Sequence, residues 1–397
     1  MNVVSRLTVV LAAGAVLTTG FITASQAQSI ADVEASTKVA ADWADGKLAN
    51  YGSAKVTYTG EPIVLRLSSH LPPVSGLAKS MMKSLPILER MSNGKLKIEA
   101  RFGGTVHSVT EGLDALRSGI TDITACFTFL APTNFPMTTM LSLPGKFPNA
   151  AVQTAVAERL APKYFVPEFD RQQVAIFGIT GSPEVDLFSR KPIRTLQDLG
   201  GLKVRSGGGI NEAVFRALGA ATVNMGSRDF YSALQRGLID AIFTNDAAGK
   251  IFRLHEVATH FIEVDLTRTP LEYCLNKKTF QALPGDLQVV YNNWARAMTM
   301  SQAQAVYVRD GVRAREDFRK AGLNFYTLPA DEHRRWIDRA KVAVEAYLAE
   351  QEKAGRPARK IVAEMDALIA QYSKQSLAEL MTDAIDNPFQ GLAPYKR

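Results

Sequence analysis

The sequence predicts an α/β protein of two lobes followed by long C-terminal helices. Three observations predict this fold class. Strands and helices alternate in each of two halves, a short motif recurs in both halves, and helical periodicity dominates the chain from about Asp286 onward. Alternating strands and helices build parallel sheets covered by helices, so two such units in one chain should leave a cleft between them.

The composition is that of an ordinary globular protein. Of 397 residues, 46% are apolar and 21% are charged, which excludes disordered, collagen-like and low-complexity classes. The formal net charge is +7, and no basic run is interleaved with aromatic residues. A solvated surface of mixed charge is therefore favoured over nucleic-acid binding.

Residues 1–27 have the pattern of a secretory signal peptide. Arg6 is the only charge, an uncharged stretch follows it, and small residues precede a cleavage site after Ala27. Because the second half of this stretch is polar, a membrane anchor is the disfavoured alternative. We expect an exported mature protein without a membrane anchor. Residues 28–61 are then an N-terminal extension with one amphipathic segment.

The first half of the chain predicts two strands and two helices in alternation. Residues 62–70 have a strand pattern, and residues 76–91 have a helical one. Apolar and charged residues alternate strictly over 95–102, as in a strand with one wet face. Ser108 and Glu111 have the spacing of a capping box, so the second helix should begin there.

An internal repeat links the two halves. The segments EGLDALRSGITDI (111–123) and DFYSALQRGLIDA (229–241) share the pattern A-L-x-x-G-[IL]-x-D. Each copy predicts a helix that ends at a glycine, followed by a short strand. We interpret the last aspartate of each pattern, Asp122 and Asp240, as structural.

The second half of the chain repeats the alternation. Strands are predicted at 201–206 and 220–225, with a helix at 211–218 between them. In the last third, one helix should begin near Pro329, and a final helix should end near Tyr372.

Residues that carry covalent or metal chemistry are scarce. Two cysteines, Cys126 and Cys274, are too few for a disulfide framework, and their distance in sequence favours buried free thiols over one long-range bridge. The five histidines lack metal-ligand spacing, and no H-E-x-x-H, C-x-x-C, G-x-S-x-G or P-loop motif is present. The sequence therefore predicts no metal, no cofactor and no enzymatic activity.

An anion site is predicted where Arg205 ends a strand. Three glycines, Gly207, Gly208 and Gly209, separate it from the start of a helix. Glycines let backbone N–H groups approach a ligand, the helix N-terminus favours negative charge, and arginine can grip a carboxylate with two hydrogen bonds. A surface arginine beside a flexible turn is the alternative.

Residues 195–256 resemble the substrate-binding proteins of TRAP (tripartite ATP-independent periplasmic) transporters. The family pattern there is D-L-x-G-x-K-[IVL]-R, a helix, G-A, a short strand, and A-L-x-x-G-x-x-D. The positions that match it are Asp198, Leu199, Gly201, Lys203, Val204, Arg205, Gly219, Ala220, Ala233, Leu234, Gly237 and Asp240. With the strands and the repeat of the first half, the resemblance covers about 62–372.

The resemblance implies a two-lobed periplasmic binding protein (Venus-flytrap) fold that closes on a small organic acid. Lobe I would comprise 62–182 plus 271–310, and lobe II would comprise 183–270 plus 311–397. Arg205 would anchor the ligand carboxylate. The ligand would then pass to the small and large membrane permease subunits.

Several positions depart from the family pattern. Many members carry a second arginine where Glu184 and Asp186 stand here. Arg228 is the nearest candidate to compensate, with a solvated arginine at a helix start as the alternative. Phe127 and Phe243 should make the pocket apolar, so we expect a monocarboxylate with an apolar or aromatic body.

The remaining candidate contacts each have a structural alternative. His70 ends the first strand and is either a ligand-facing hydrogen-bonding group or a structural histidine. Phe127 faces either the cleft or the core. Thr244 and Asn245 end a strand of the second half and are candidate polar contacts.

Three other functions compete with that of a transport receptor. A receptor of the same fold could serve a sensor kinase instead of a permease. An exported hydrolase or isomerase would show turnover of candidate acids. A structural cell-envelope protein gives no reason for an arginine–triglycine cleft and is disfavoured.

Overall fold

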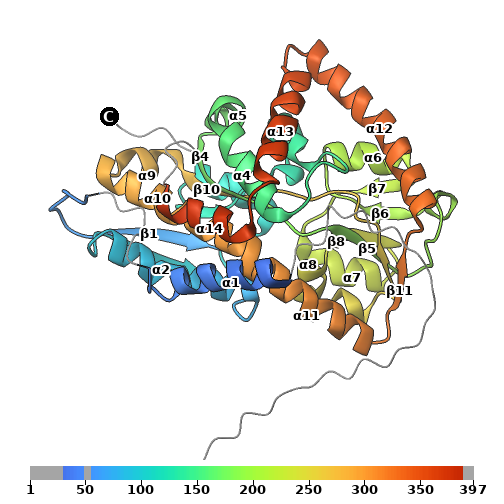
Figure 1. The fold of residues 1–397 in the computed structure, drawn as a ribbon, viewed down its shortest axis with the longest axis horizontal. Helices are drawn as coiled ribbons and strands as arrows, with labels where there is room; N and C mark the ends of the chain where they lie inside the picture. The colour runs from blue at the N-terminus through green and yellow to red at the C-terminus, as the bar shows by residue number, and fades with distance from the viewer. Residues whose placement is uncertain (1–29, 49–54, 388–397) are drawn as a thin grey trace, which may run out of the picture.

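The computed structural model describes residues 30–48 and 55–387, which fold around two β-sheets. Figure 1 shows one sheet in each half of the molecule, with helices on its faces. The two-lobed α/β fold is thereby confirmed. The predicted signal peptide at 1–27 lies outside the described residues.

The first sheet has five strands in the order β2-β1-β3-β10-β4. Strands β1, β2 and β3 are parallel, whereas β10 is antiparallel to both of its neighbours. The predicted parallel units are therefore interrupted by one strand that returns from the other lobe. The bounds are β1 (Ile63–Ser68), β2 (Leu96–Arg101), β3 (Ile123–Ala125), β4 (Val174–Thr180) and β10 (Leu271–Asn276).

The second sheet has six strands in the order β11-β9-β5-β8-β6-β7. Strands β8, β6 and β7 are parallel, and β5 runs antiparallel between β9 and β8. The bounds are β5 (Val185–Ser189), β6 (Lys203–Arg205), β7 (Ala221–Val223), β8 (Ala241–Asn245), β9 (His260–Glu263) and β11 (Asn324–Thr327).

Helices cover both sheets. Residues 76–91 form α2 as predicted, and the capping box at Ser108 precedes a 3-10 turn that leads into α3. The first-lobe helices are α2 (Gly76–Met91), α3 (Gly112–Arg117), α4 (Ala150–Leu160), α5 (Val166–Arg171) and α9 (Lys277–Ala282). The second-lobe helices are α6 (Ile210–Ala217), α7 (Phe230–Gln235) and α8 (Asp246–Ile251).

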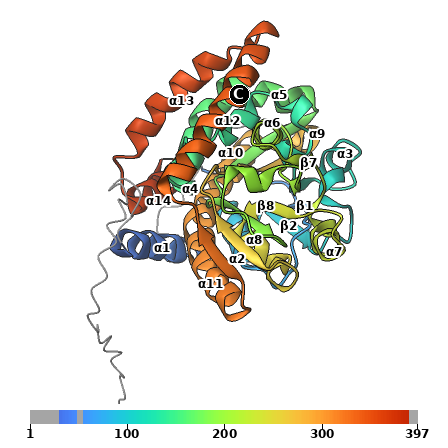
Figure 2. The same cartoon turned by 90° about the vertical axis from the view of Figure 1, so that its right-hand side faces the viewer.

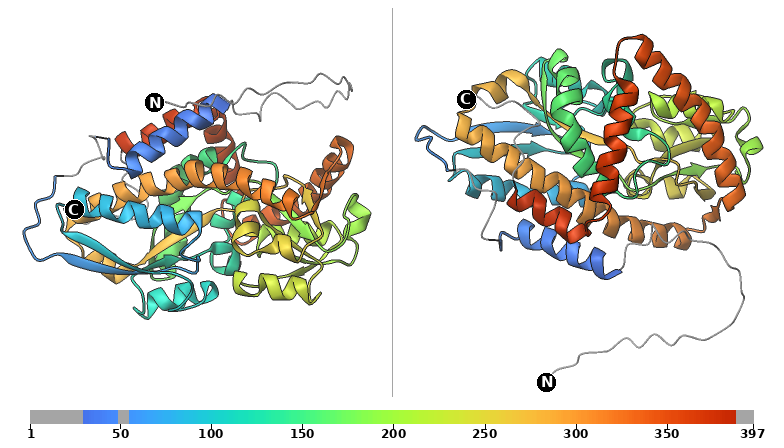
Figure 3. Two further views of the ribbon diagram at one scale, coloured as in Figure 1. Left: turned by 90° about the horizontal axis from the view of Figure 1, so that it is seen from below. Right: turned by 45° about the horizontal axis from the view of Figure 1, so that its top comes forward.

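Three segments cross between the lobes. One joins β4 to β5, and one joins β9 to β10; the two pair through a bridge between Glu184 and Arg268. The third is a long helix of α10 (Gly285–Ser301), a π-helical turn η9 (Gln302–Val306) and α11 (Tyr307–Lys320). Helix α10 packs on β4 and α2, while α11 packs on α8 of the other lobe. Figure 3 shows this helix running the length of the molecule.

The last two C-terminal helices and the N-terminal helix meet on the first lobe. Helix α12 (Ala330–Lys353) packs on α6, and α13 (Ala358–Tyr372) returns to α4 (Figure 2). A further helix, α14 (Leu377–Asp386), lies beside α1 (Ile30–Ala44) and α10. The predicted helix end near Tyr372 is confirmed, but the prediction that this helix is the last one is wrong. The proposed division of the chain between lobes stays a prediction; α13 and α14, which it assigns to lobe II, pack on lobe I helices.

The repeated motif has the same structural role in both lobes. Asp122 accepts a hydrogen bond from the backbone N–H of Arg66 in β1, at 2.8 Å. Asp240 accepts one from the backbone N–H of Lys203 in β6, at 2.9 Å. Each aspartate thus joins the strand after its helix to the neighbouring strand, which confirms the structural interpretation.

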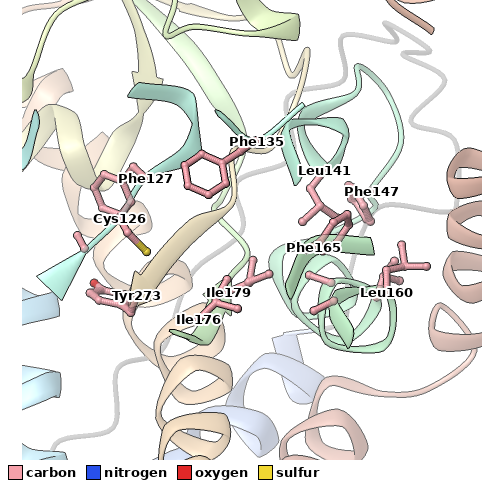
Figure 4. Packing of buried hydrophobic residues seen from close by; sticks show 14 of the residues in the cluster. Cys126, Phe127, Phe135, Leu141, Phe147, Leu160, Phe165, Ile176, Ile179 and Tyr273 are labelled. Carbon is pink, nitrogen blue, oxygen red and sulfur yellow. The ribbon is translucent and has the colours of Figure 1, made fainter. Parts of the chain in front are cut away.

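A disulfide bond joins Cys126 and Cys274, so the prediction of free thiols is wrong. Strand β10 lies beside β3, with Cys274 paired to Thr124, and the two cysteine Cα atoms are 5.8 Å apart. Figure 4 shows Cys126 near Phe127 and Tyr273, and all three belong to the buried apolar cluster. The large sequence separation was a poor guide, because the fold places β10 directly beside β3 although the two cysteines are 148 residues apart in the chain.

No helix within the described ranges is long and apolar enough to span a membrane.

Candidate functional site

A cavity lies between the lobes, at the carboxyl ends of strands β1, β3, β6 and β8. Its volume is about 100 Å³. One water needs roughly 10–15 Å³, so the cavity has room for a small organic molecule. Six of the predicted site residues line it: His70, Phe127, Arg205, Gly207, Thr244 and Asn245.

Arg205 is the last residue of β6 and is only 7% exposed. Its Nη1 donates a long hydrogen bond of 3.4 Å to the carbonyl oxygen of Phe243, and its buried Nε has no partner. Among the described residues no carboxylate pairs with it, and burial lowers its pKa to about 10. The site therefore holds a buried positive charge that the protein does not neutralise.

Two aromatic rings flank the Arg205 guanidinium. Its central carbon lies 4.6 Å from the ring centroid of Phe230 and 5.5 Å from that of Phe129. Ring faces attract a cation within about 6 Å, more strongly when water is excluded. These rings hold the guanidinium in place without supplying a counter-ion.

The glycine run brings the two lobes into contact. The Gly208 N–H donates to the carbonyl oxygen of Phe129 at 2.9 Å. A Cβ at Gly208 would lie 2.6 Å from that oxygen and 2.9 Å from the Cγ of Pro132. Gly208 is absent from the cavity lining, and its N–H is already used between the lobes, so the geometry does not support its predicted role as a ligand donor. Gly207 lines the cavity with a φ of 74°.

An aromatic wall continues from Phe129 into the first lobe. The Phe129 and Phe127 rings stack with centroids 5.3 Å apart, and the His70 ring meets Phe127 edge-on at 5.4 Å. Phe127 is 8% exposed and belongs to both the cavity lining and the apolar core. Burial, with the charge of His107, lowers the pKa of His70 to about 4, so its ring is neutral at pH 7.

Strand β8 and helix α6 supply amide and hydroxyl groups. Thr244 and Asn245 line the cavity at the end of β8. The Asn245 Oδ1 accepts a hydrogen bond from the N–H of Ala248 at 2.9 Å and so caps α8. The amide N–H₂ group of Asn245 is then available to donate to other partners. Asn211, in the first turn of α6, also lines the cavity.

Arg228 lies outside the cavity lining. Its Nη2 donates to the carbonyl oxygen of Gly104 at 3.1 Å. Gly104 lies in the first lobe and Arg228 in the second, so this hydrogen bond joins the lobes outside the cavity. The geometry thus does not support Arg228 as a second clamp for the ligand.

The acidic residues of the crossing segment face away from Arg205. Val185 lines the same cavity as Arg205, whereas Glu184 and Asp186 line a separate cavity. Strand residues alternate between faces, which explains this split. Glu184 pairs with Arg268, and Asp186 pairs with Arg315 at 3.2 Å. These acids therefore do not add charge to the Arg205 cavity.

The cavity residues that sequence reasoning missed include Asn211, Phe230, Tyr273 and Tyr307. Asn211 had a usable signal, because it follows the glycine run in the first turn of a helix. Tyr273 lies in the returning strand β10, and Tyr307 begins α11. No sequence signal places those two elements at the cavity.

The chain matches the model of one protein family over residues 69–351: DctP, bacterial extracellular solute-binding protein, family 7. A solute-binding protein of Sulfitobacter sp. (strain NAS-14.1) is 26% identical over 299 residues, covering 72% of this chain and 87% of the relative. The C4-dicarboxylate-binding periplasmic protein DctP of Rhodobacter capsulatus is 24% identical over 286 residues, covering 70% and 84%.

Solved structures share the fold. A TRAP solute-binding protein from Rhodoferax ferrireducens T118, in complex with copurified benzoate, superposes with a TM-score of 0.73 at 22% identity, covering 79% of this chain and 99% of that chain. A TRAP periplasmic solute-binding protein from Bordetella bronchiseptica, with bound (R)- and (S)-mandelate, gives 0.72 at 22% identity, covering 78% and 99%. The chain belongs to the bacterial extracellular solute-binding proteins of family 7, as its resemblance to TRAP substrate-binding proteins predicted.

Proposed function

We propose that this protein captures a small monocarboxylate with an aromatic or branched apolar body and delivers it to a TRAP permease. The observation that carries the proposal is the buried Arg205 guanidinium without a carboxylate partner. A charge buried without a partner is costly, and a ligand carboxylate in two-point contact would remove that cost. Asn211, Thr244 and Asn245 would supply further hydrogen bonds.

The cavity lining argues against a second acidic group on the ligand. Arg205 is the only lysine or arginine in that lining, and His70 is neutral at pH 7. A second ligand carboxylate would therefore be buried unpaired, next to the rings of Phe127, Phe129 and Phe230. We infer a preference that differs from the C4-dicarboxylate named for the Rhodobacter capsulatus relative.

The other parts of the proposal follow from the family. The chain would be exported by residues 1–27 and act in the periplasm, free of the membrane. Its partners would be the small and large membrane permease subunits. It would release its ligand unchanged, without a metal or cofactor.

Competition binding to the purified protein tests this proposal. Benzoate, phenylacetate and 3-methylbutanoate are compared with succinate and malate by calorimetry. We expect at least one monocarboxylate to bind about tenfold or more tightly than either dicarboxylate. Tenfold tighter binding of succinate or malate than of every monocarboxylate would contradict the proposed pocket chemistry, and turnover of a bound acid would contradict the transport role.

A further inference from the structure

Among the polar side chains of the cavity that the carboxylate contact does not use are one histidine and two tyrosines. His70 follows β1, Tyr273 lies in β10, and Tyr307 is the first residue of α11. All three line the cavity. None of their polar side-chain atoms makes a hydrogen bond with any residue of 30–48 or 55–387.

These three groups are uncharged at neutral pH. Burial, with the charge of His107, lowers the pKa of His70 to about 4. Burial raises the pKa values of Tyr273 and Tyr307, and the charge of Tyr273 adds to the upward shift of the Tyr307 pKa. The three groups can therefore exchange hydrogen bonds with a ligand but cannot neutralise a second carboxylate.

The aromatic wall connects these groups to the Arg205 end of the cavity. Phe129 contacts the guanidinium and stacks on Phe127. Phe127 in turn lies 5.4 Å from the His70 ring and 6.5 Å from the Tyr273 ring, between centroids. A flat ligand body along this wall would have its carboxylate at Arg205 and its far edge toward the histidine and the tyrosines.

Polar groups on a cavity wall that have no hydrogen-bond partner in the protein favour a ligand that can bond to them. We propose that His70, Tyr273 and Tyr307 form a second polar subsite that selects acids with an uncharged hydroxyl or carbonyl group on the body. This inference rests on the proposed function and adds the chemistry of the far end of the ligand. Hydroxylated aromatic monocarboxylates are the class it favours.

The subsite also includes an element that crosses between the lobes. Tyr307 immediately follows the π-helical turn η9, between the part of the long helix that packs on the first lobe and the part that packs on the second. A ligand that bonds Tyr307 and Arg205 together would contact both lobes and the connecting helix.

Matched ligand pairs test the subsite on the unmodified protein. The 2-, 3- and 4-hydroxybenzoates are compared by calorimetry with the corresponding methylbenzoates, which have a substituent of similar size without hydrogen bonds. A site built to bind a hydroxyl rejects an analogue that lacks it. We expect at least one hydroxy acid to bind about tenfold more tightly than its methyl partner. Equal or weaker binding of every hydroxy acid, with benzoate still bound through Arg205, would overturn the subsite alone.

Variants identify the groups responsible. Tyr273→Phe and Tyr307→Phe should each reduce the hydroxy-to-methyl preference severalfold, whereas Tyr291→Phe, a buried tyrosine of α10 outside the cavity lining, should leave it unchanged. An unchanged preference in both cavity variants would overturn the assignment. If no monocarboxylate binds, aromatic or branched, or if Arg205→Ala binds benzoate like the wild type, the proposed function fails, and this inference fails with it.

Discussion

Cys126, just after β3, is joined by a disulfide bond to Cys274 in β10. The next residue along the chain, Phe127, and the residue before Cys274, Tyr273, both line the ligand cavity. The bond therefore fixes the returning strand beside the end of β3, where two walls of the cavity meet.

Removal of this disulfide should destabilise the protein. Removal of a native disulfide typically costs about 2–5 kcal/mol, with the larger values for long loops, chiefly because the bond restricts the unfolded chain. The double variant Cys126→Ser with Cys274→Ser should lose about this much free energy of unfolding in chemical denaturation. As a control, the free energies of unfolding of the wild type and the double variant are compared in the presence of the same reducing agent. An oxidised wild type no more stable than the double variant would contradict this.

Glu272 should give the protein a specific pH dependence. Its carboxyl is fully buried in β10, where it accepts hydrogen bonds from the N–H and hydroxyl of Thr128, and burial raises its pKa to about 8. The folded state therefore holds this proton while the unfolded chain releases it above its ordinary pKa of 4.5. The contribution of Glu272 to the free energy of unfolding is therefore fully present below pH 4.5 and is lost as the pH rises toward 8.

The variant Glu272→Gln separates this effect from other titrations. Its amide keeps the hydrogen-bonding shape without a titrating proton. The free energy of unfolding of the variant, minus that of the wild type, should increase from pH 4.5 to 8 and then level off. A difference that stays flat across this range would show that Glu272 is not held protonated.

Much of the fold could be predicted from local patterns. Residues 76–91 and the strand at 96–101 agree with the pattern because capping, helical periodicity and strict alternation are local signals. The order of strands in each sheet is not local. The insertion of β10 beside β3, and hence the disulfide, depends on packing between segments 148 residues apart.

The site residues likewise fall into those that local patterns predict and those that they do not. Arg205 and Gly207 could be found because they belong to a strand–glycine–helix pattern, and both line the cavity. Tyr273 and Tyr307 could not be found in this way, because β10 and α11 reach the cavity only where the chain crosses between the lobes. Helix α14 had a usable signal in the capping box of Ser376 and Glu379 that sequence reasoning overlooked.

Ligand binding should close the lobes around Arg205. A substitution at Gly208 tests whether binding requires the close approach of the two lobes at this residue. A Cβ there would meet the Phe129 carbonyl oxygen at 2.6 Å, so Gly208→Ala should prevent full contact. We expect weaker binding and, by small-angle scattering at saturating ligand, a larger radius of gyration than for the liganded wild type. Gly200→Ala, whose Cβ would meet only the Gln197 carbonyl of its own lobe, is the matched control. Equal radii with and without ligand in the wild type would indicate a rigid pocket.

Arg228 should affect closure and not ligand choice. Arg228→Ala removes the hydrogen bond to Gly104 between the lobes. Because exposed contacts of this kind contribute little, affinity should fall only a few-fold, and equally for mono- and dicarboxylates. A loss confined to dicarboxylates in calorimetry would instead make Arg228 the second clamp.

The calorimetric affinity of Arg205→Ala for the best monocarboxylate is the most direct test of the account. Loss of one partner of a buried charge pair costs about 2–5 kcal/mol, so affinity should fall roughly 30-fold or more while the thermal unfolding of the free protein stays cooperative. Arg205→Lys should restore only part of the binding, because an ammonium group cannot make the planar two-point contact. Wild-type affinity in a folded Arg205→Ala protein would contradict the central claim that this buried guanidinium binds the ligand carboxylate.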